Sequence, residues 1–346
     1  MEEKKISEEK KNINIYDIAK LAGVSIATVS RVINQKGNVT PETRMRVEKV
    51  ISEQNYMPNV FARGLGLGTM KVVGVLCSTV IDMYYAKAVG TIEEALRELG
   101  YDVILSCTGN IKEDKQKSME MLVSKHVDAL VLIGSVFKET DDNSHIERIA
   151  KQVPVILING YVNIKNTYCV VCEEDKAMQE VVNTFVKVGR KNILYLEAPG
   201  TWSSISKMAG YKRGLKENKI PFRPELVLSL PKDPGVIRNA VQEFLEKKIP
   251  FDGVCASEDL FSVSAMNVLT ERGIAVPEDI AVMGYNNSLL CECSAPALSS
   301  VDNRVVDLSK MAIKILLDIF EGRSPRQKTV IPYYFVFRKS FPQPGK

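Results

Sequence analysis

The side chains best suited to chemistry in this 346-residue chain lie within twenty residues, from Ile15 to Asn34 (IYDIAKLAGVSIATVSRVIN), and their chemistry is hydrogen bonding. Arg31 carries a guanidinium that can bind guanine through two parallel hydrogen bonds. Hydroxyl and amide groups that suit phosphate oxygens belong to Tyr16, Thr28, Ser30 and Asn34. The stretch therefore predicts a surface that contacts double-stranded DNA.

Two short helices joined by a tight turn must position these groups. The apolar residues Ile15, Ile18, Ala19 and Ala22 share one helical face, and Gly23 can adopt the left-handed backbone that ends a helix. Ser25 is the expected N-cap of a second helix, whose inward residues are Val29, Val32 and Ile33. Its outward residues are Ile26, Ala27, Thr28, Ser30 and Arg31. In a helix-turn-helix, Ile26, Ala27 and Arg31 would reach base edges, and the polar side chains, Ser25 included, would contact the DNA backbone.

Helical spacing alone also fits an ordinary hairpin of helices inside a larger core. The residues that follow favour DNA reading. The stretch 39–56 predicts a third helix, with Thr40 as its cap, Pro41 at its first position and Val47, Val50 and Ile51 on its apolar face. From residue 15 to residue 63 there are seven Lys or Arg and four Asp or Glu, a net charge of +3 out of +4 for the chain. Such an excess attracts a polyanion, and salt should weaken the binding steeply.

The stretch from Ile15 to Leu65 resembles the DNA-binding headpiece of the lactose and galactose repressor (LacI-type) family of bacterial transcription regulators. The matching motifs are I-Y-D-I-A-K-L-A-G-V-S-x-x-T-V-S-R-V-I-N, V-T-P-E-T-R-x-R-V and N-Y-M-P-N-x-x-A-R-x-L. The resemblance implies that 59–65 forms a hinge helix when two copies meet on DNA. Asn59, Ala62 and Leu65 would then contact DNA, with Leu65 as a wedge in the minor groove. Glycines at 64, 66 and 68 disfavour that helix before binding.

Composition sets the class of protein. With 45% hydrophobic and 25% charged residues, the chain can bury a large core in two or three domains. Its apolar runs are far shorter than the roughly 20 residues that span a bilayer. The first twelve residues, MEEKKISEEKKN, are a charged tail without the apolar segment of a signal peptide. We expect a cytoplasmic protein with no membrane partner.

The seven cysteines are expected to be reduced thiols, because they are odd in number and irregularly placed. Cys169 and Cys172 are spaced C-x-x-C, and Cys291 and Cys293 C-x-C, which leaves a zinc or redox site as the alternative. The two histidines of the chain, at 126 and 145, are distant from both pairs. We expect no metal and no cofactor.

From Lys71 onward, strand and helix patterns alternate. The first set has strands at 72–79, 101–109 and 128–135, with helices at 91–100 and 113–124. The rhythm restarts at 154–160, with further strands at 168–175, 192–198, 226–230, 253–257 and 281–287 and helices at 176–188, 206–218 and 234–246. Short apolar runs separated by helices are typical of parallel sheets with right-handed crossovers. Two sets predict two doubly wound lobes.

The resemblance to the LacI-type family continues through this region. Its motifs are Gly100-Tyr101-Asp102, Val127-Asp128, Asp259, the run 276–280, Gly284-Tyr285, Ala295-Pro296 with Leu298, and Arg338 with Ser340. It implies an α/β core like a periplasmic binding protein, in which three crossing strands join two lobes around a ligand cleft. The expected domains are a tail (1–12), an all-α helix-turn-helix domain (13–56), a hinge (57–70) and the core (71–346). The N-lobe would take 71–170 and 302–330, and the C-lobe 171–301 and 331–346.

Ligands of such sheets bind at the carboxyl ends of the strands. The loops expected there are 80–85, 172–175, 198–207, 257–259 and 285–288. Trp202, Tyr84 and Tyr85 are candidates for stacking on a sugar ring, with core packing as the alternative for each of them. The polar candidates are Asp82, Glu173, Glu174, Lys207, Glu258, Asp259 and Asn286.

Several of these positions depart from the family pattern. Lys207 replaces the usual arginine of sugar-responsive members, Glu258 an asparagine or serine, and Asn286 an aspartate. Asp82 replaces an asparagine, and Glu173-Glu174 an Asp-Asn pair. A planar fork is exchanged for a point charge, and carboxylates gather where amides are usual. We therefore expect a ligand with a cationic or amino group, or a heavily hydroxylated one, in place of a plain neutral hexose.

The resemblance predicts a homodimeric repressor that binds a palindromic operator and responds to a small sugar-like effector. An activator or a corepressor-dependent regulator of the same fold is the alternative. A free-standing solute-binding protein would carry an export signal and no helix-turn-helix. An enzyme would need a catalytic constellation, and the sequence has no G-x-S-x-G, P-loop or H-E-x-x-H motif. We expect no catalytic residue.

Overall fold

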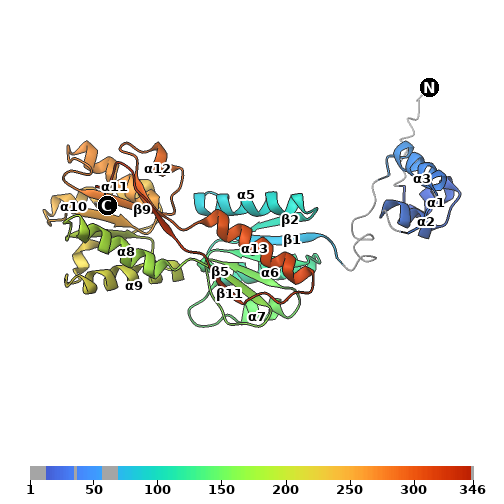
Figure 1. Cartoon of the computed structure of the whole chain (residues 1–346), viewed down its shortest axis with the longest axis horizontal. Helices are drawn as coiled ribbons and strands as arrows, with labels where there is room; N and C mark the ends of the chain where they lie inside the picture. The colour runs from blue at the N-terminus through green and yellow to red at the C-terminus, as the bar shows by residue number, and fades with distance from the viewer. Residues whose placement is uncertain (1–12, 35–36, 57–68, 344–346) are drawn as a thin grey trace, which may run out of the picture. The chain divides into compact units, whose positions relative to one another are not determined.

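The structure is a computed structural model that describes residues 13–34, 37–56 and 69–343. The chain divides into two compact units between Lys71 and Val72 (Figure 1), and each is described by itself. The predictions for the tail 1–12 and for Asn59, Ala62 and Leu65 lie outside the described residues. Among the helices described, none is long and apolar enough to cross a membrane.

The first unit has three helices, α1 (Ile15–Ala22), α2 (Ile26–Ile33) and α3 (Pro41–Glu53). Gly23 ends α1 with a φ of 63°, so its predicted left-handed backbone is confirmed. The side chains of Ser25 and Thr40 accept backbone N–H groups at the starts of α2 and α3, as predicted. A small core of Ile18, Ala19, Ala22, Val29, Val32 and Val47 holds the three helices together.

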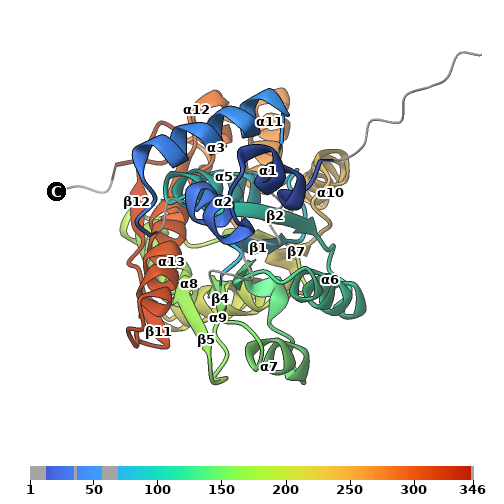
Figure 2. The ribbon, with the colours of Figure 1, turned by 90° about the vertical axis from the view of Figure 1, so that its right-hand side faces the viewer.

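The second unit begins with a lobe built on a parallel six-stranded sheet in the order β11-β5-β4-β3-β1-β2. The strands are β1 (Val72–Cys77), β2 (Asp102–Cys107), β3 (Ala129–Ile133), β4 (Val155–Ile158), β5 (Thr167–Val171) and β11 (Lys328–Val330). The helices are α5 (Met83–Glu98), α6 (Lys112–Ser124), α7 (Ser144–Ala150) and α13 (Val305–Phe320), with the short η1 (Ser135–Phe137). Helices α5 and α13 cover one face of the sheet, and α6 and α7 the other (Figures 1 and 2).

The second lobe has the same plan, with the sheet order β12-β10-β9-β8-β6-β7. Its strands are β6 (Ile193–Glu197), β7 (Val227–Ser229), β8 (Gly253–Ala256), β9 (Ala281–Tyr285), β10 (Ser299–Asp302) and the antiparallel edge strand β12 (Tyr334–Val336). Helices α8 (Glu174–Lys187) and α9 (Trp202–Glu217) cover one face. Helices α10 (Pro234–Glu246) and α11 (Asp259–Glu271) cover the other, where η2 (Pro224–Leu226) and α12 (Leu290–Cys293) contribute Leu226 and Cys291 to the same core.

The described chain passes between the lobes three times, between β5 and α8, between β10 and α13, and between β11 and β12. One expectation is wrong. The rhythm of strands does not restart a new lobe at 154–160, because β4 pairs with β3, and β5 pairs with β4 in the first sheet. Periodicity identifies a strand, whereas its neighbour depends on contacts far away in sequence.

Several elements begin earlier than expected or were not expected at all. Helix α5 starts at Met83 and not at 91, and α9 starts at Trp202 and not at 206. The sequence pattern did not lead us to α7, α11, α12, α13, β10, β11 or β12. As a result, Tyr84, Tyr85, Trp202 and Lys207, which we expected in loops, lie on helices.

Candidate functional site

The outward face of α2 carries the residues predicted to read DNA. Ile26, Ala27 and Arg31 are exposed, with 39% of Ile26 accessible. Ser25 and Thr28 are tied to the helix start, because Ser25 Oγ accepts the Thr28 N–H at 3.2 Å and lies 2.9 Å from the Thr28 hydroxyl. The three exposed side chains are therefore free to enter a groove, with Ser25 and Thr28 fixing the helix end behind them.

The remaining predicted contacts of this unit differ in exposure. Tyr16 on α1 is 67% exposed. Asn34 is half-buried at the end of α2, where its Nδ2 donates to Ser30 Oγ at 3.2 Å. Gly37 was not predicted to matter, yet a Cβ at this position would lie 3.4 Å from Arg31 Cδ. A side chain larger than glycine at this position would thus contact the stem of Arg31.

In the second unit, the predicted ligand residues gather around a buried lysine. Lys207 on α9 is 4% exposed, and its Nζ donates to the Ser257 carbonyl at 2.9 Å. The same Nζ lies 3.3 Å from Glu174 Oε1 and 3.9 Å from the centre of the Tyr285 ring. A charge taken out of water needs such partners. Within the second lobe, Lys207 therefore connects Glu174 of α8, the Ser257 carbonyl after β8 and the Tyr285 ring at the end of β9.

Glu174 connects the two lobes. Its Oε1 accepts hydrogen bonds from Asn159 Nδ2 at 3.0 Å and from Ser203 Oγ at 2.8 Å. Asn159 follows β4 of the first lobe, and Ser203 lies in the first turn of α9. The Glu174 carboxylate, which we expected to bind a ligand, thus accepts hydrogen bonds from both lobes.

Tyrosine hydroxyls without hydrogen-bond partners mark the same region. Among the described residues, the buried hydroxyls of Tyr84, Tyr195 and Tyr285 have no partner. Burial, and then the charge of Glu174, hold the pKa of Tyr84 well above its usual value. Tyr84 meets Tyr85 edge-to-face at 5.5 Å, and burial raises the pKa of Tyr85 to about 12. These hydroxyls are exceptions to the rule that buried polar groups are hydrogen-bonded.

Trp202 lies where the second lobe touches the first. Its Nε1 donates to the Glu139 carbonyl at 3.2 Å, and Lys138 Nζ lies 3.6 Å from the centre of its ring. The neighbouring Ser203 N–H donates to Ser135 Oγ at 3.0 Å. The environment of the Trp202 ring therefore depends on the contact between the lobes.

A second charged group links the two lobes. Lys232 Nζ lies 2.9 Å from Asp82 Oδ2 and 2.5 Å from Glu258 Oε1. Burial alone would lower the pKa of Lys232, but the carboxylates of Glu258 and Asp82 outweigh it and raise that pKa. Burial raises the pKa of Glu258, and Lys232 opposes the rise. The sequence analysis missed Lys232, although it follows β7 at the same carboxyl edge as the loops it selected.

Three predicted ligand residues are engaged elsewhere. Asp259 accepts from the Ser300 hydroxyl at 2.6 Å and from the Ser288 N–H at 2.7 Å, so it supports the loop after β9. Asn286 accepts from Asn303 Nδ2 at 2.8 Å. Glu173 pairs at the surface with Lys176 at 2.7 Å. The first two lie beside the cleft loops and shape them through these bonds.

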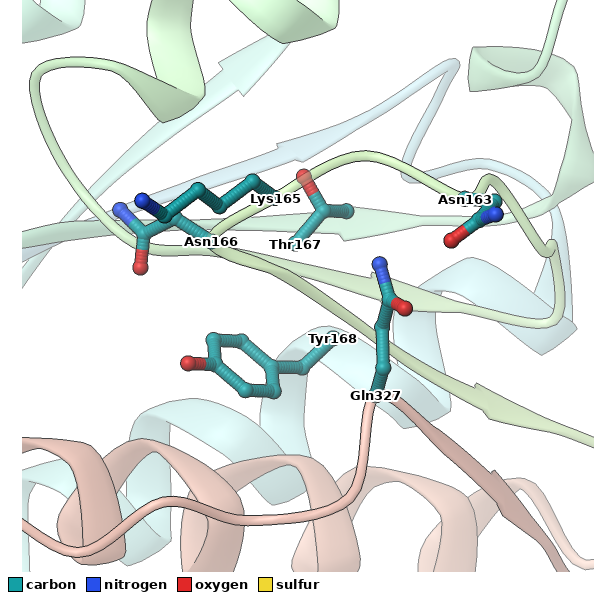
Figure 3. A pocket seen from close by; sticks show the side chains of 6 residues that line it. All are labelled: Asn163, Lys165, Asn166, Thr167, Tyr168 and Gln327. Carbon is teal, nitrogen blue, oxygen red and sulfur yellow. The ribbon is translucent and has the colours of Figure 1, made fainter.

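A separate pocket of about 400 Å³ lies in the first lobe, lined by Asn163, Lys165, Asn166, Thr167, Tyr168 and Gln327 (Figure 3). It sits at the amino end of β5 and ahead of β11, the opposite end of these strands from Glu174. Two of its side-chain amides hydrogen-bond to the backbone, because Asn166 donates to the Ala150 carbonyl and Gln327 donates to the Ile164 carbonyl. Across the described ranges, no three His, Cys, Asp or Glu side chains are grouped to hold a metal ion.

Both units of the chain match families of known proteins. Residues 14–59 match the family of bacterial regulatory proteins called the lacI family, and residues 182–341 match the periplasmic binding protein-like domain. An HTH-type transcriptional regulator of Lachnoclostridium phytofermentans is 40% identical over 330 residues, which cover 95% of this chain and 99% of that protein. The chain belongs to the lacI family of bacterial regulatory proteins.

Other members of the lacI family are similar along the whole chain. Catabolite control protein A of Priestia megaterium is 29% identical, over 95% of this chain and 99% of its own. The Lac repressor dimer bound to operator and the anti-inducer ONPF has a TM-score of 0.85 at 24% identity, over 95% of this chain and 99% of its own. The CelR–cellobiose complex has a TM-score of 0.69 at 24% identity, with the same coverage. These structures confirm the predicted fold class of this lacI-family regulator.

Proposed function

We propose that this lacI-family protein is a transcriptional repressor that binds a palindromic operator as a homodimer and that changes its affinity when a small polar metabolite fills the cleft. The observation that carries the proposal is the exposed row of Ile26, Ala27 and Arg31 on a capped helix, in one chain with a two-lobed core. Two copies related by a two-fold axis would present this row to successive major grooves. Such a regulator works in the cytoplasm, where bacterial DNA lies.

The residues of the cleft support a sugar or a related metabolite as the effector. The unpaired hydroxyls of Tyr84 and Tyr285 can bind a hydroxylated ligand, and the half-buried Trp202 offers an apolar face. Two of the similar structures contain a small ligand: CelR is in complex with cellobiose, and the Lac repressor is bound to the anti-inducer ONPF. Because Glu174 and Trp202 of the second lobe each hydrogen-bond to the first lobe, a ligand here would change how the lobes meet.

Coupling between the cleft and the operator is reciprocal. A ligand that favours one arrangement of the lobes changes operator affinity by the same factor by which the operator changes ligand affinity. An activator or a corepressor-dependent regulator would use the same two sites. The names of the relatives are those of transcriptional regulators, and a catalytic role has no support from them.

The test is selection of bound duplexes from random DNA by the full-length protein, with and without a panel of metabolites. We expect a palindromic consensus and at least one sugar-like compound that alters its recovery. In transcription from a promoter carrying that consensus, the protein should lower the yield of transcript. A rise in transcript would instead identify an activator, and the absence of any consensus would refute the proposal.

A further inference from the structure

Carboxylates from opposite lobes meet at one ammonium group. Asp82 caps α5 of the first lobe, whereas Glu258 stands at the start of α11 in the second. Lys232, in the segment between β7 and α10 of the second lobe, binds both of them, at 2.9 and 2.5 Å. The two carboxylates are thus held close together across the cleft by a single cation.

The charges around this point do not balance. Glu174 has Lys207 as a partner, and Glu173 has Lys176. Of the four carboxylates, only Asp82 and Glu258 share one cation between two negative charges. A second cation placed here would be attracted, and withdrawal of Lys232 would leave two carboxylates that repel each other across the lobes.

Asp82 is positioned more firmly than the lysine. Asp82 is anchored because its Oδ1 accepts the Tyr84 N–H at 2.9 Å, and the side chains of Asp82 and Glu258 are 16% and 20% exposed. The Lys232 side chain is 39% exposed and reaches them on a four-carbon stem. Lys207, by contrast, is buried and fixed by the Ser257 carbonyl and Glu174. Lys232 can therefore move to solvent while Asp82 remains in place.

We propose that the space between Asp82 and Glu258 is an ammonium subsite that Lys232 fills in this structure, and that the effector carries a protonated amine that takes the place of Lys232. This inference rests on the proposed function and names the chemical class of the effector. An amino sugar has this chemistry, because its ammonium would bind the two carboxylates while its hydroxyls meet the unpaired hydroxyls of Tyr84 and Tyr285.

Trp202 supplies the signal for the test, because it is the one tryptophan of the chain and bonds to the first lobe. In the full-length protein, Lys232→Ala should shift the emission of Trp202 to longer wavelength, since repulsion between Asp82 and Glu258 loosens the contact of the lobes. Methylammonium chloride should restore the wild-type spectrum. Tetramethylammonium chloride at the same concentration should not, because it donates no hydrogen bond. The matched control Lys176→Ala removes a charge from a surface pair and should leave the spectrum unchanged.

Two results would overturn the subsite. One is a wild-type emission spectrum in Lys232→Ala, and the other is an equal response to both ammonium salts. If Lys232→Ala loses its far-ultraviolet circular dichroism and so does not fold, the test uses Lys232→Met, which keeps the aliphatic stem. In the wild-type protein, glucosamine should alter the emission at about ten-fold lower concentration than glucose. Equal or stronger action of glucose would refute the amine as the distinguishing group.

Operator binding separates this inference from the proposed function. Sequence-selective binding of a DNA duplex, measured without any sugar, depends on α2 and not on Lys232. If that binding is present and the amine response is absent, the proposal of an ammonium subsite is refuted and the proposed repressor function is retained. If the amine response is present and no duplex is preferred, the repressor is wrong and the subsite stands.

Discussion

Arg31 and Asn34 lie on one short helix, yet we expect them to have different roles. Arg31 is exposed, whereas Asn34 is half-buried and bonded to Ser30. Arg31→Ala should cost about 1–3 kcal/mol on the best operator and relax sequence preference, because a base contact is lost. Asn34→Ala should weaken all duplexes alike. Fluorescence anisotropy with the selected operator and a scrambled duplex measures both. Uniform losses for both variants would contradict these roles.

The cysteines provide a second test at the scale of single residues. Burial, and then the charge of Glu174, raise the pKa of Cys172 to about 12, so little thiolate exists at pH 8. Cys107 and Cys293 are exposed. Iodoacetamide should therefore modify Cys107 and Cys293 first, as seen by mass spectrometry of the folded protein. Labelling of Cys172 should rise about ten-fold for each pH unit between 8 and 10, because the pH remains below its pKa. A pH-independent rate at Cys172 would contradict this.

Residue identity and loop position selected several side chains that the structure brings together, but they did not indicate how the charges of these side chains are paired. Lys207 and Glu174 were both candidates, and the structure brings them to 3.3 Å of each other. Their ion pair depends on α8 and α9 packing together, which no local pattern encodes. Lys232 carried no signal beyond its place after a strand, and its partners are distant in sequence.

At the scale of elements, local signals were the reliable ones. Gly23, Ser25 and Thr40 fixed helix ends through bonds within a few residues. Helix α11 was missed because small residues such as Ser262, Ser264 and Ala265 are all buried, so the helix lacks a clear polar face. Strands β11 and β12 are only three residues long, too short for a pattern.

One glycine substitution tests how β9 packs on α11. A Cβ at Gly284 would lie 2.2 Å from Asp259 Oδ1 and 2.9 Å from Leu298 Cδ2. Gly284→Ala should therefore lower the free energy of unfolding by about 1–3 kcal/mol, because Asp259 is held by Ser288 and Ser300 and cannot yield freely. Chemical denaturation measures the change.

The matched control makes the same substitution in open space. Gly90 lies inside α5, and nothing is within 4 Å of the Cβ that alanine would add. Gly90→Ala should raise the free energy of unfolding by about 0.5–1 kcal/mol, because alanine is the better helix former. If both variants shift stability in the same direction, the close packing at Gly284 is not what governs it.

At the scale of the whole molecule, the chain combines a DNA-reading unit with a core of two lobes, and three crossings of the described chain join these lobes. The class of each lobe was predictable, since alternating strands and helices restrict the topology. The strand rhythm did not assign β4 and β5 to the first sheet, because strand order is a property of the assembled sheet, whereas the N-lobe bounds implied by the family resemblance did include them. Family motifs supplied the overall plan, which the 40% identical relative confirms.

The most direct measurement is the affinity of the full-length dimer for its selected duplex, relative to bulk genomic fragments, across a range of salt concentrations. The account predicts binding at least about 10³-fold tighter to the selected duplex at physiological salt. Affinity for both should fall as salt rises, because phosphate contacts release counterions. Equal affinity for the selected duplex and the bulk fragments would contradict the central claim that α2 reads base sequence.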